Sequence, residues 1–216
     1  RVSNPSQFLE TLKFLCVAGA PEGPNVMGFT CSGGGATMLA DHGEVIGLNF
    51  APLDDAAKEA LTHLLPPIAT VSNPLDYTTP IWGHAEKTRP VFATAMARIA
   101  ADATVLVQDY PAPELREAEA PYLIDGHAFA DAAIAAGLPA AICATIPENM
   151  GARVREAFVA RGIAPMQGIH ETLNAIRDAA WWRGAQARIL GDLPEPMLAG
   201  KPIGKKRLLN EAEGKE

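Results

Sequence analysis

The sequence has few of the features that mark secreted, membrane-bound or nucleic-acid-binding proteins. Its three cysteines, Cys16, Cys31 and Cys143, are scattered and odd in number, so they predict no disulfide framework and favour a reducing, cytoplasmic location. No apolar run approaches the ~20 residues that a membrane-spanning helix needs. The formal net charge of -7 argues against nucleic acid or an anionic membrane as the main partner. The 48% of hydrophobic residues is enough for a sizeable core.

Several familiar site motifs are also missing. The chain has no Gly-Lys-Ser/Thr, and therefore no P-loop. Its glycine-rich turn, Ser32–Ala36, is not a dinucleotide fingerprint, because Met38 occupies the place of the third glycine. It is not the nucleophile elbow of a hydrolase either, because Thr30 replaces the first glycine. None of the five histidines pairs with a second histidine or a cysteine at metal-ligand spacing, so no metal site is predicted.

The glycine-rich turn is the most informative stretch that is present. Val26–Cys31 is a short, mostly apolar run typical of a buried parallel strand, and apolar or small residues recur at helical spacing up to Ile46. The first N–H groups of a helix have no internal partner, and the helix dipole is positive there. We therefore predict a phosphate site, with the N–H groups of Gly34, Gly35 and Ala36 unpaired and Ser32 as an extra donor. The predicted phosphate-binding residues are Ser32, Gly33, Gly34, Gly35 and Ala36. The competing interpretation is a tight packing turn without a ligand.

Strand and helix patterns alternate along the chain, which predicts an α/β fold with a parallel sheet covered on both faces. We expect a flavodoxin-like, doubly wound sheet of about five parallel strands in a three-layer αβα arrangement. The predicted strands are Val26–Cys31, Leu48–Ala51, Ala103–Tyr110, Ala140–Ile146 and Ile163–Met166. After an opening helix that follows Asn4-Pro5, the predicted helices include Asp54–Leu65, His84–Ala101, Ala120–Ala136, Met150–Arg161 and His170–Leu190. The predicted domain is 1–191, and the proline-rich, aperiodic residues 192–216 are expected to form a linker and the start of a further module.

A polar loop follows the second predicted strand and its helix. It reads Asn73-Pro-Leu-Asp76-Tyr-Thr-Thr79. Asn and Asp side chains can bond nearby backbone N–H groups, so Asn73 and Asp76 are expected to support this loop beside the glycine turn without touching substrate. Because loops also carry functional residues, a direct role stays open. Cys31 precedes a helix start, where a thiolate would be stabilised, but a buried thiol at the end of a strand is the favoured interpretation.

These stretches together resemble one family. Ser32-Gly-Gly-Gly-Ala36, Ala40-Asp41, Gly47-Leu48, Leu64-Leu-Pro66 and Asn73-Pro-Leu-Asp76 are similar, in this order, to segments of the NDP-forming acyl-CoA synthetases. These enzymes are relatives of succinyl-CoA synthetase and of ADP-forming acetate–CoA ligase. The match extends to the tail, where Leu208–Lys215 resembles the entry to the ATP-grasp module of the family.

The resemblance implies a function for the glycine turn. Such enzymes interconvert acyl-CoA, NDP and phosphate with acid, CoA and NTP, and they pass the phosphoryl group through a histidine. Two helix N-termini, one from each of two flavodoxin-like domains, hold the phosphohistidine. This chain resembles the second of those domains, so the resemblance implies a phosphate-capping role for its glycine turn.

The chain departs from the family pattern at one decisive feature. The phosphorylated histidine of the family is followed by Thr-Gly, and no histidine of this sequence is. We therefore expect no catalytic residue and no bound cofactor in this part. The CoA-binding, carrier-histidine and ATP-grasp domains are the expected partners, and they would supply the sites for CoA, ATP or ADP, and Mg. The chain by itself is expected to be inactive as an acid–thiol ligase.

Two other functions stay open from the residues. One is a stand-alone flavodoxin-like module that binds a small anion or effector. The other is a serine hydrolase that uses Ser32. A His-Thr-Gly loop and an ATP-grasp module in the full reading frame would favour the synthetase, whereas labelling of Ser32 by a fluorophosphonate would favour the hydrolase.

Overall fold

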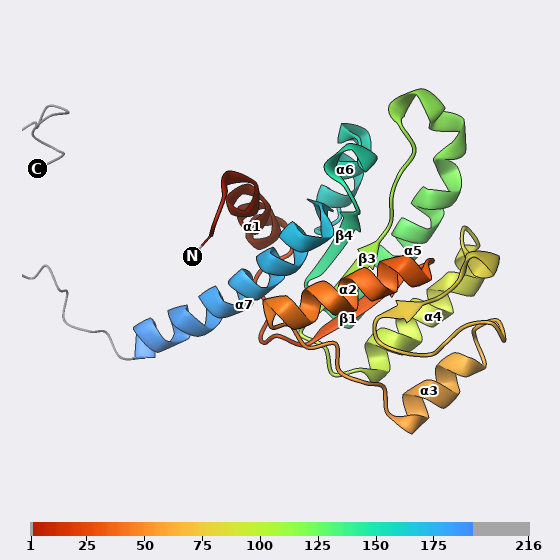
Figure 1. Ribbon diagram of the computed structural model, residues 1–216, viewed down its shortest axis with the longest axis horizontal. Helices are drawn as coiled ribbons and strands as arrows, with labels where there is room; N and C mark the ends of the chain where they lie inside the picture. Colours follow the sequence, from red (N-terminus) through yellow and green to blue (C-terminus); the bar gives the residue numbers. More distant parts are fainter. Residues whose placement is uncertain (1, 192–216) are drawn as a thin grey trace, which may run out of the picture. The chain divides into compact units, whose positions relative to one another are not determined.

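The computed structural model describes residues 2–191, and its core is a parallel sheet of five strands (Figure 1). The sheet order is β2-β1-β3-β4-β5, with all neighbouring pairs parallel. This is the flavodoxin-like order, so the predicted fold class is confirmed. The strands are β1 (Val26–Thr30), β2 (Leu75–Asp76), β3 (Ala103–Val107), β4 (Ala140–Ala144) and β5 (Ala164–Gln167).

Seven α-helices follow the order that the periodicity predicts. Their bounds differ from the predicted ones mainly at the ends, where a run of apolar residues continues past the last hydrogen-bonded turn. The helices are α1 (Pro5–Val17), α2 (Gly33–Ile46), α3 (Asp55–Thr62), α4 (Ala85–Arg98), α5 (Ala120–Ala136), α6 (Ala152–Val159) and α7 (Ile169–Gly191). Short 3₁₀ turns lie at Thr79–Ile81, Pro113–Ala118 and Pro147–Asn149.

Alternation along the central strands creates two separate cores. Successive strand side chains point to opposite faces of a sheet, so Phe29 and Leu106 belong to one core whereas Val105 belongs to the other. The first core packs against α3, α4, α5 and α6, and includes Leu61, Phe92, Phe129 and Phe158. The second packs against α1, α2 and α7, and includes Phe14, Leu39 and Ile176. The three-layer arrangement expected from the sequence follows from this division.

One predicted strand is wrong. Leu48–Ala51 forms only an isolated bridge, in which Asn25 pairs with Asn49. The edge of β1 is instead covered by three partners in succession. Asn49 pairs at its beginning, the Asn73 side chain bonds along its middle, and β2 pairs Leu75 with Phe29 at its end. Leu48–Ala51 therefore contributes only Asn49 to the sheet, because Asn73 and β2 occupy the rest of this edge.

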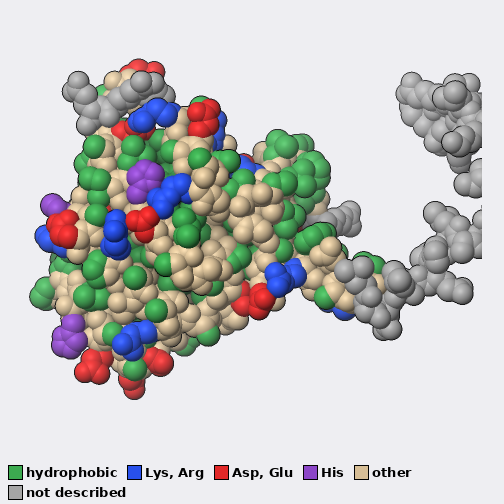
Figure 2. Space-filling model, turned by 180° about the vertical axis from the view of Figure 1, so that it is seen from behind, with side chains coloured by type: hydrophobic (Ala, Val, Ile, Leu, Met, Phe, Trp, Pro, Cys, Tyr) green, Lys and Arg blue, Asp and Glu red, His purple; other side chains and the backbone are tan. Residues whose placement is uncertain are grey.

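The compact unit that contains the sheet reaches Gly184, and α7 continues to Gly191. The domain bounds 1–191 stay a prediction, and the expected linker at 192–216 lies outside the described residues. No helix in the described part of the chain is both long and apolar enough to cross a membrane. Figure 2 shows acidic and basic side chains interspersed among hydrophobic ones on the face opposite to that of Figure 1.

Candidate anion-binding pocket at the sheet edge

A pocket of about 370 Å³ lies at the carboxyl ends of β1, β3 and β4. In a sheet of order 2-1-3-4-5, the gap between β1 and β3 is the point where the chain reverses its direction across the sheet, and ligands of such folds bind there. The start of α2 forms one side of the pocket and two aromatic rings form another. The lining residues include Cys31, Ser32, Gly34, Gly35, Met38, Thr79, Trp82, Gln108, Asp109, Tyr122 and Thr145.

Ser32 caps the helix that borders this pocket. It is extended, and its hydroxyl accepts a hydrogen bond from the N–H of Gly35 at 3.4 Å, while its carbonyl accepts from the N–H of Ala36 at 3.1 Å. The prediction that the Gly35 and Ala36 N–H groups are free is therefore wrong, because an N-cap residue satisfies these donors itself. Within residues 2–191, the N–H groups that have no partner at this helix start are those of Gly33 and Gly34.

Gly34 and Gly35 differ in how much space a side chain would have at each position. A Cβ atom at Gly35 would lie 2.6 Å from Thr30 Oγ1, whereas one at Gly34 would meet Ser32 Oγ only at 3.6 Å. Neither backbone has a positive φ. Within this domain, a Cβ atom at Gly34 therefore makes only an ordinary van der Waals contact. Gly35 is the position at which the close contact between helix and strand requires glycine.

The Asn73 side chain makes three hydrogen bonds to backbone groups far from it in the sequence. Its carbonyl oxygen accepts from the N–H of Gly28 at 3.0 Å, and its amide donates to the carbonyls of Val26 at 2.9 Å and Ala51 at 3.1 Å. The side chain thereby replaces a strand neighbour along the middle of β1. It fixes the loop that leads into β2 at the edge of the sheet.

Asp76 has a local bond and a second, less expected position. Its Oδ1 accepts from the N–H of Thr78 at 2.9 Å, which is the turn-supporting bond that the sequence predicted. Its Oδ2 would lie 3.6 Å from a Cβ built at Gly33. A carboxylate therefore lies beside the start of α2, where it competes with an incoming anion for the positive end of the helix dipole.

The pocket is lined by an acidic side chain rather than by basic ones. Among residues 2–191, no lysine or arginine lines it, whereas Asp109 does. Asp109 is fixed by Thr145, whose N–H donates to Oδ1 at 2.8 Å. Burial first, and then the nearby Asp125, Asp76 and Asp109 carboxylates, raise the pKa of the Cys31 thiol to about 11. Cys31 is therefore a protonated thiol at neutral pH, which favours the interpretation as a strand-end thiol over a reactive thiolate.

Two polar groups of the pocket wall have no partner inside the described part of the protein. They are the indole N–H of Trp82 and the side-chain carbonyl of Gln108, whose amide nitrogen donates to the Tyr122 carbonyl at 2.7 Å. Buried polar atoms are normally paired, so these two are exceptions among the residues that line the pocket. Sequence reasoning missed both, because Trp82 and Gln108 belong to separate segments that no spacing connects.

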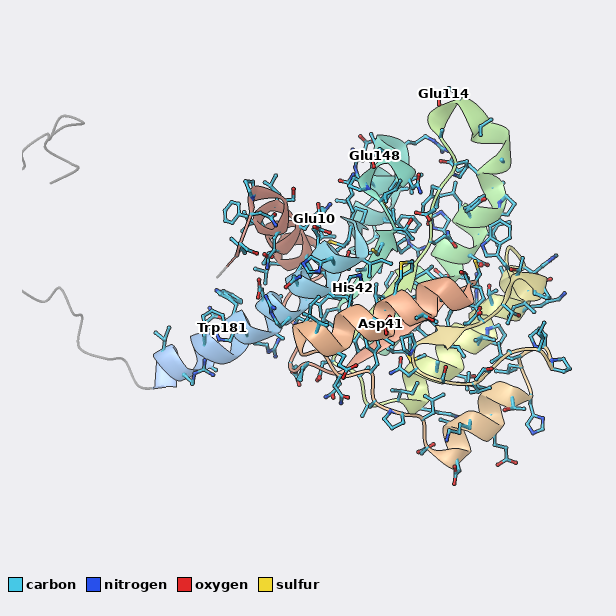
Figure 3. The ribbon with its side chains drawn as sticks, viewed as in Figure 1. Glu10, Asp41, His42, Glu114, Glu148 and Trp181 are labelled. Carbon is cyan, nitrogen blue, oxygen red and sulfur yellow. The ribbon has the colours of Figure 1, made fainter. Side chains whose placement is uncertain are left out.

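Two histidines that are far apart in the sequence lie close together in the structure. His42 lies on α2 (Figure 3). Its ring centroid is 5.6 Å from that of His170 on α7, and both residues line a smaller pocket that shares Met38 and Thr145 with the larger one. In the range 2–191, no group of three or more His, Cys, Asp or Glu residues is arranged to hold a metal ion. The pair therefore gives two imidazoles without the further ligands of a closed metal site.

The fold and the pocket together define a flavodoxin-like domain with a capped helix start at its switch point. Comparison of the sequence with family models finds no match, and comparison with curated proteins finds none either. Comparison with solved structures does find similar folds. The protein PH0766 from Pyrococcus horikoshii OT3 is 19% identical with a TM-score of 0.68, over 88% of this chain and 42% of that one.

Two further similar structures come from an enzyme. The dinucleotide-forming acetyl-coenzyme A synthetase 1 of Ca. Korarchaeum cryptofilum, in its apo form, is 17% identical with a TM-score of 0.67, over 89% of this chain and 41% of that one. Its complex with phosphate and ADP gives 17% identity and a TM-score of 0.66, over 90% and 40%. The expected similarity to acyl-CoA synthetases is thus confirmed at the level of the fold. The chain spans less than half of the length of these proteins.

Proposed function

We propose that this chain is a domain of an NDP-forming acyl-CoA synthetase, and that the start of α2 caps a phosphoryl group during transfer. The observation that carries the proposal is the pair of unpaired N–H groups at Gly33 and Gly34, located at the switch point of the sheet. Ser32 holds the first turn in place and lines the same pocket, so its hydroxyl proton can add a third donor. The similarity to an acetyl-CoA synthetase, one structure of which is a complex with phosphate and ADP, supports the enzyme class.

The magnitudes explain why such a domain would act together with others. One helix N-terminus stabilises an anion by about 0.3–1 kcal/mol, or about 2 kcal/mol when partly buried, whereas millimolar affinity requires about 4 kcal/mol. The carboxylates of Asp76 and Asp109 reduce the available stabilisation further. The remaining positive charge and the covalent attachment of the phosphoryl group therefore come from partner domains in this proposal.

CoA, the nucleotide and Mg are assigned to those partner domains as well. The described residues do not fit a nucleotide–Mg site, because the chain has no P-loop and the donor groups needed for a metal are not brought together. The proposed contribution of this chain is therefore limited to hydrogen bonds from the backbone of α2 and from Ser32. We expect the chain by itself to show no CoA-dependent formation of ATP.

A phosphate titration followed by amide NMR tests the capping role. Inorganic phosphate up to about 0.1 M should shift the amide signals of Gly33 and Gly34 with an affinity weaker than about 1 mM. The amide of Gly137 is a matched control, because it lies at the opposite end of a helix and is already bonded to carbonyls of α5. Equal shifts at Gly137 and at Gly33, or none at Gly33 and Gly34, would contradict the capping role.

The same experiment separates the alternative functions. A stand-alone anion-binding module would bind phosphate or another small anion at Gly33 and Gly34 with micromolar affinity and without partner domains. A hydrolase would need a base next to Ser32, but in the described residues the Ser32 hydroxyl accepts only from the Gly35 N–H. Labelling by a fluorophosphonate should therefore be no greater for this chain than for its Ser32→Ala variant.

A further inference from the structure

Asp125 on α5 is a fully buried carboxylate with an unusual set of partners. Its side chain accepts from the hydroxyl of Tyr77 at 2.9 Å, from the N–H of Gly83 at 3.0 Å and from the hydroxyl of Thr88 at 3.1 Å. All three donors belong to one stretch, residues 77–88, which joins β2 to α4. The Asp125 carboxylate thus bonds both ends and the middle of residues 77–88.

This segment forms the aromatic wall of the switch-point pocket. Thr79 and Trp82 line the pocket, and the unpaired indole N–H belongs to Trp82. The ring of Trp82 packs edge-on against Tyr122, with centroids 4.7 Å apart. Gly83, which follows Trp82 directly, has a φ of +76°, so the chain turns sharply at the residue that Asp125 bonds.

The geometry points to Asp125 as the positioning residue for Trp82. We propose that its bond to the N–H of Gly83 fixes the turn that places the Trp82 indole in the wall of the pocket. Tyr122 and Asp125 are three residues apart and so lie on one face of α5. This face therefore holds Trp82 twice, through the ring contact of Tyr122 and through the backbone bond of Asp125 to the next residue.

The surroundings show why a side-chain acceptor oxygen is needed at this place. Three donors converge from one side, and a carboxylate accepts them with two oxygens and no donor of its own. Burial raises the pKa of Asp125, and the hydrogen bonds from Tyr77, Gly83 and Thr88 oppose that rise. An alanine would leave the Tyr77 hydroxyl and the Gly83 N–H without an acceptor, because only the Thr88 hydroxyl has another one, the His84 carbonyl at 3.3 Å. An asparagine keeps one acceptor oxygen at the place of Oδ1, which serves Gly83 and Thr88.

The fluorescence of Trp82 tests the proposal in the full 216-residue chain. The chain has three tryptophans, so the background Trp181→Phe/Trp182→Phe leaves Trp82 as the only reporter. We expect Asp125→Ala to increase the acrylamide quenching of Trp82 by about twofold or more, because a buried bond of the turn is lost. Asp125→Asn should keep quenching close to that of the background. The matched control is Asp131→Ala, which removes a partly exposed carboxylate of the same helix that pairs with Arg89 and Arg161.

Each outcome decides the proposal. Equal quenching in Asp125→Ala and Asp131→Ala would overturn it, and so would an Asp125→Asn variant as exposed as Asp125→Ala. If circular dichroism shows that Asp125→Ala is unfolded, Thr88→Val replaces it, because this change removes one of the two bonds that orient Oδ1. Increased quenching in Thr88→Val then supports the proposal, and unchanged quenching overturns it.

The inference rests on the proposed function only in treating this pocket as the functional site. Phosphate titration of the same variants keeps the two claims separate. Trp82 quenching that changes as expected, with no phosphate shift at Gly33 and Gly34 in any variant, would leave the positioning role and remove the capping role. Phosphate shifts at Gly33 and Gly34 with unchanged Trp82 quenching would leave the capping role and remove the positioning role.

Discussion

The pair of substitutions Gly35→Ala and Gly34→Ala gives a sharp test of the glycine turn. The two residues are adjacent in the first turn of α2, and both have helical rather than left-handed backbone angles. They differ in what a methyl group would meet. At Gly35 it would lie 2.6 Å from Thr30 Oγ1 and 3.2 Å from Thr30 Cβ. At Gly34 the nearest atom would be Ser32 Oγ, at 3.6 Å. Thr30 is buried at the end of β1.

These distances predict changes of opposite sign in the free energy of unfolding of the two variants. Overpacking a buried contact costs about 1–3 kcal/mol, so Gly35→Ala should lower the free energy of unfolding by that amount. Replacing glycine by alanine at an unstrained position stabilises by about 0.4–1 kcal/mol, so Gly34→Ala should be neutral or stabilising. For a chain of this size, each kcal/mol corresponds to about 2–4 °C in Tm. The two variants should therefore differ by several degrees.

Urea denaturation and thermal unfolding measure this difference. Thr30→Ala in the Gly35→Ala background removes the clashing oxygen and should restore part of the loss, which a double-mutant cycle would show as coupling. A Gly35→Ala protein as stable as Gly34→Ala would refute the packing argument. Equal losses in both variants would instead mean that the whole turn requires glycine.

Four further predictions follow from single contacts. Asn73→Ala should lower the free energy of unfolding by about 2–4 kcal/mol, because three backbone groups of the sheet edge lose their partner; a change below about 1 kcal/mol in urea denaturation would contradict this. The pKa of Asp125 is raised in the folded state, so its stabilising effect is present below the unfolded pKa of about 3.9 and is lost as the pH rises through the folded value. The unfolding free energy of the wild type should accordingly fall relative to Asp125→Asn over that window, and a constant difference would refute the assignment. Cys31, with a pKa raised to about 11, should react with iodoacetamide at pH 8 more slowly than the exposed Cys16, as mass spectrometry of the alkylated peptides would report. The amides of Lys205–Glu216, outside the described residues, should exchange hydrogen without protection, and slow exchange would contradict the linker prediction.

The acidic residues near the start of α2 bear on which ligand the pocket can bind. A helix start with three glycines predicts an anion site, but Asp76 lies beside Gly33 and Asp109 lines the same pocket. Acidic groups around a helix N-terminus favour a ligand that brings its own positive charge or hydrogen-bond donors together with its anion. The electrostatics therefore agree with a domain that completes a site shared with partners, as proposed above.

Much of the fold was predictable because it depends on local periodicity. The alternation of strand and helix patterns predicted the layers, and α5 was predicted at its observed bounds, Ala120–Ala136. The cap at Ser32 is equally local, because a hydroxyl before a helix start bonds the third residue on wherever that helix is placed. Asn73 was predicted to support a loop from its residue type, although its actual partners lie on β1 and near Ala51.

Only the tertiary structure decided which segments occupy the edge of the sheet and which side chains meet at its carboxyl end. Leu48–Ala51 has a strand-like composition, but Asn49, Asn73 and β2 divide the edge of β1 among themselves, and no local pattern records that competition. Likewise, the close contact of Gly35 with Thr30 depends on how closely a helix packs on a strand, which sequence spacing does not express. The sequence by itself determined the elements and their caps, since these depend on neighbours a few residues away. The pocket, with Asp125 holding the turn beside Trp82, depends on contacts such as the bond between Gly83 and Asp125, 42 residues apart, so only the packed chain could define it.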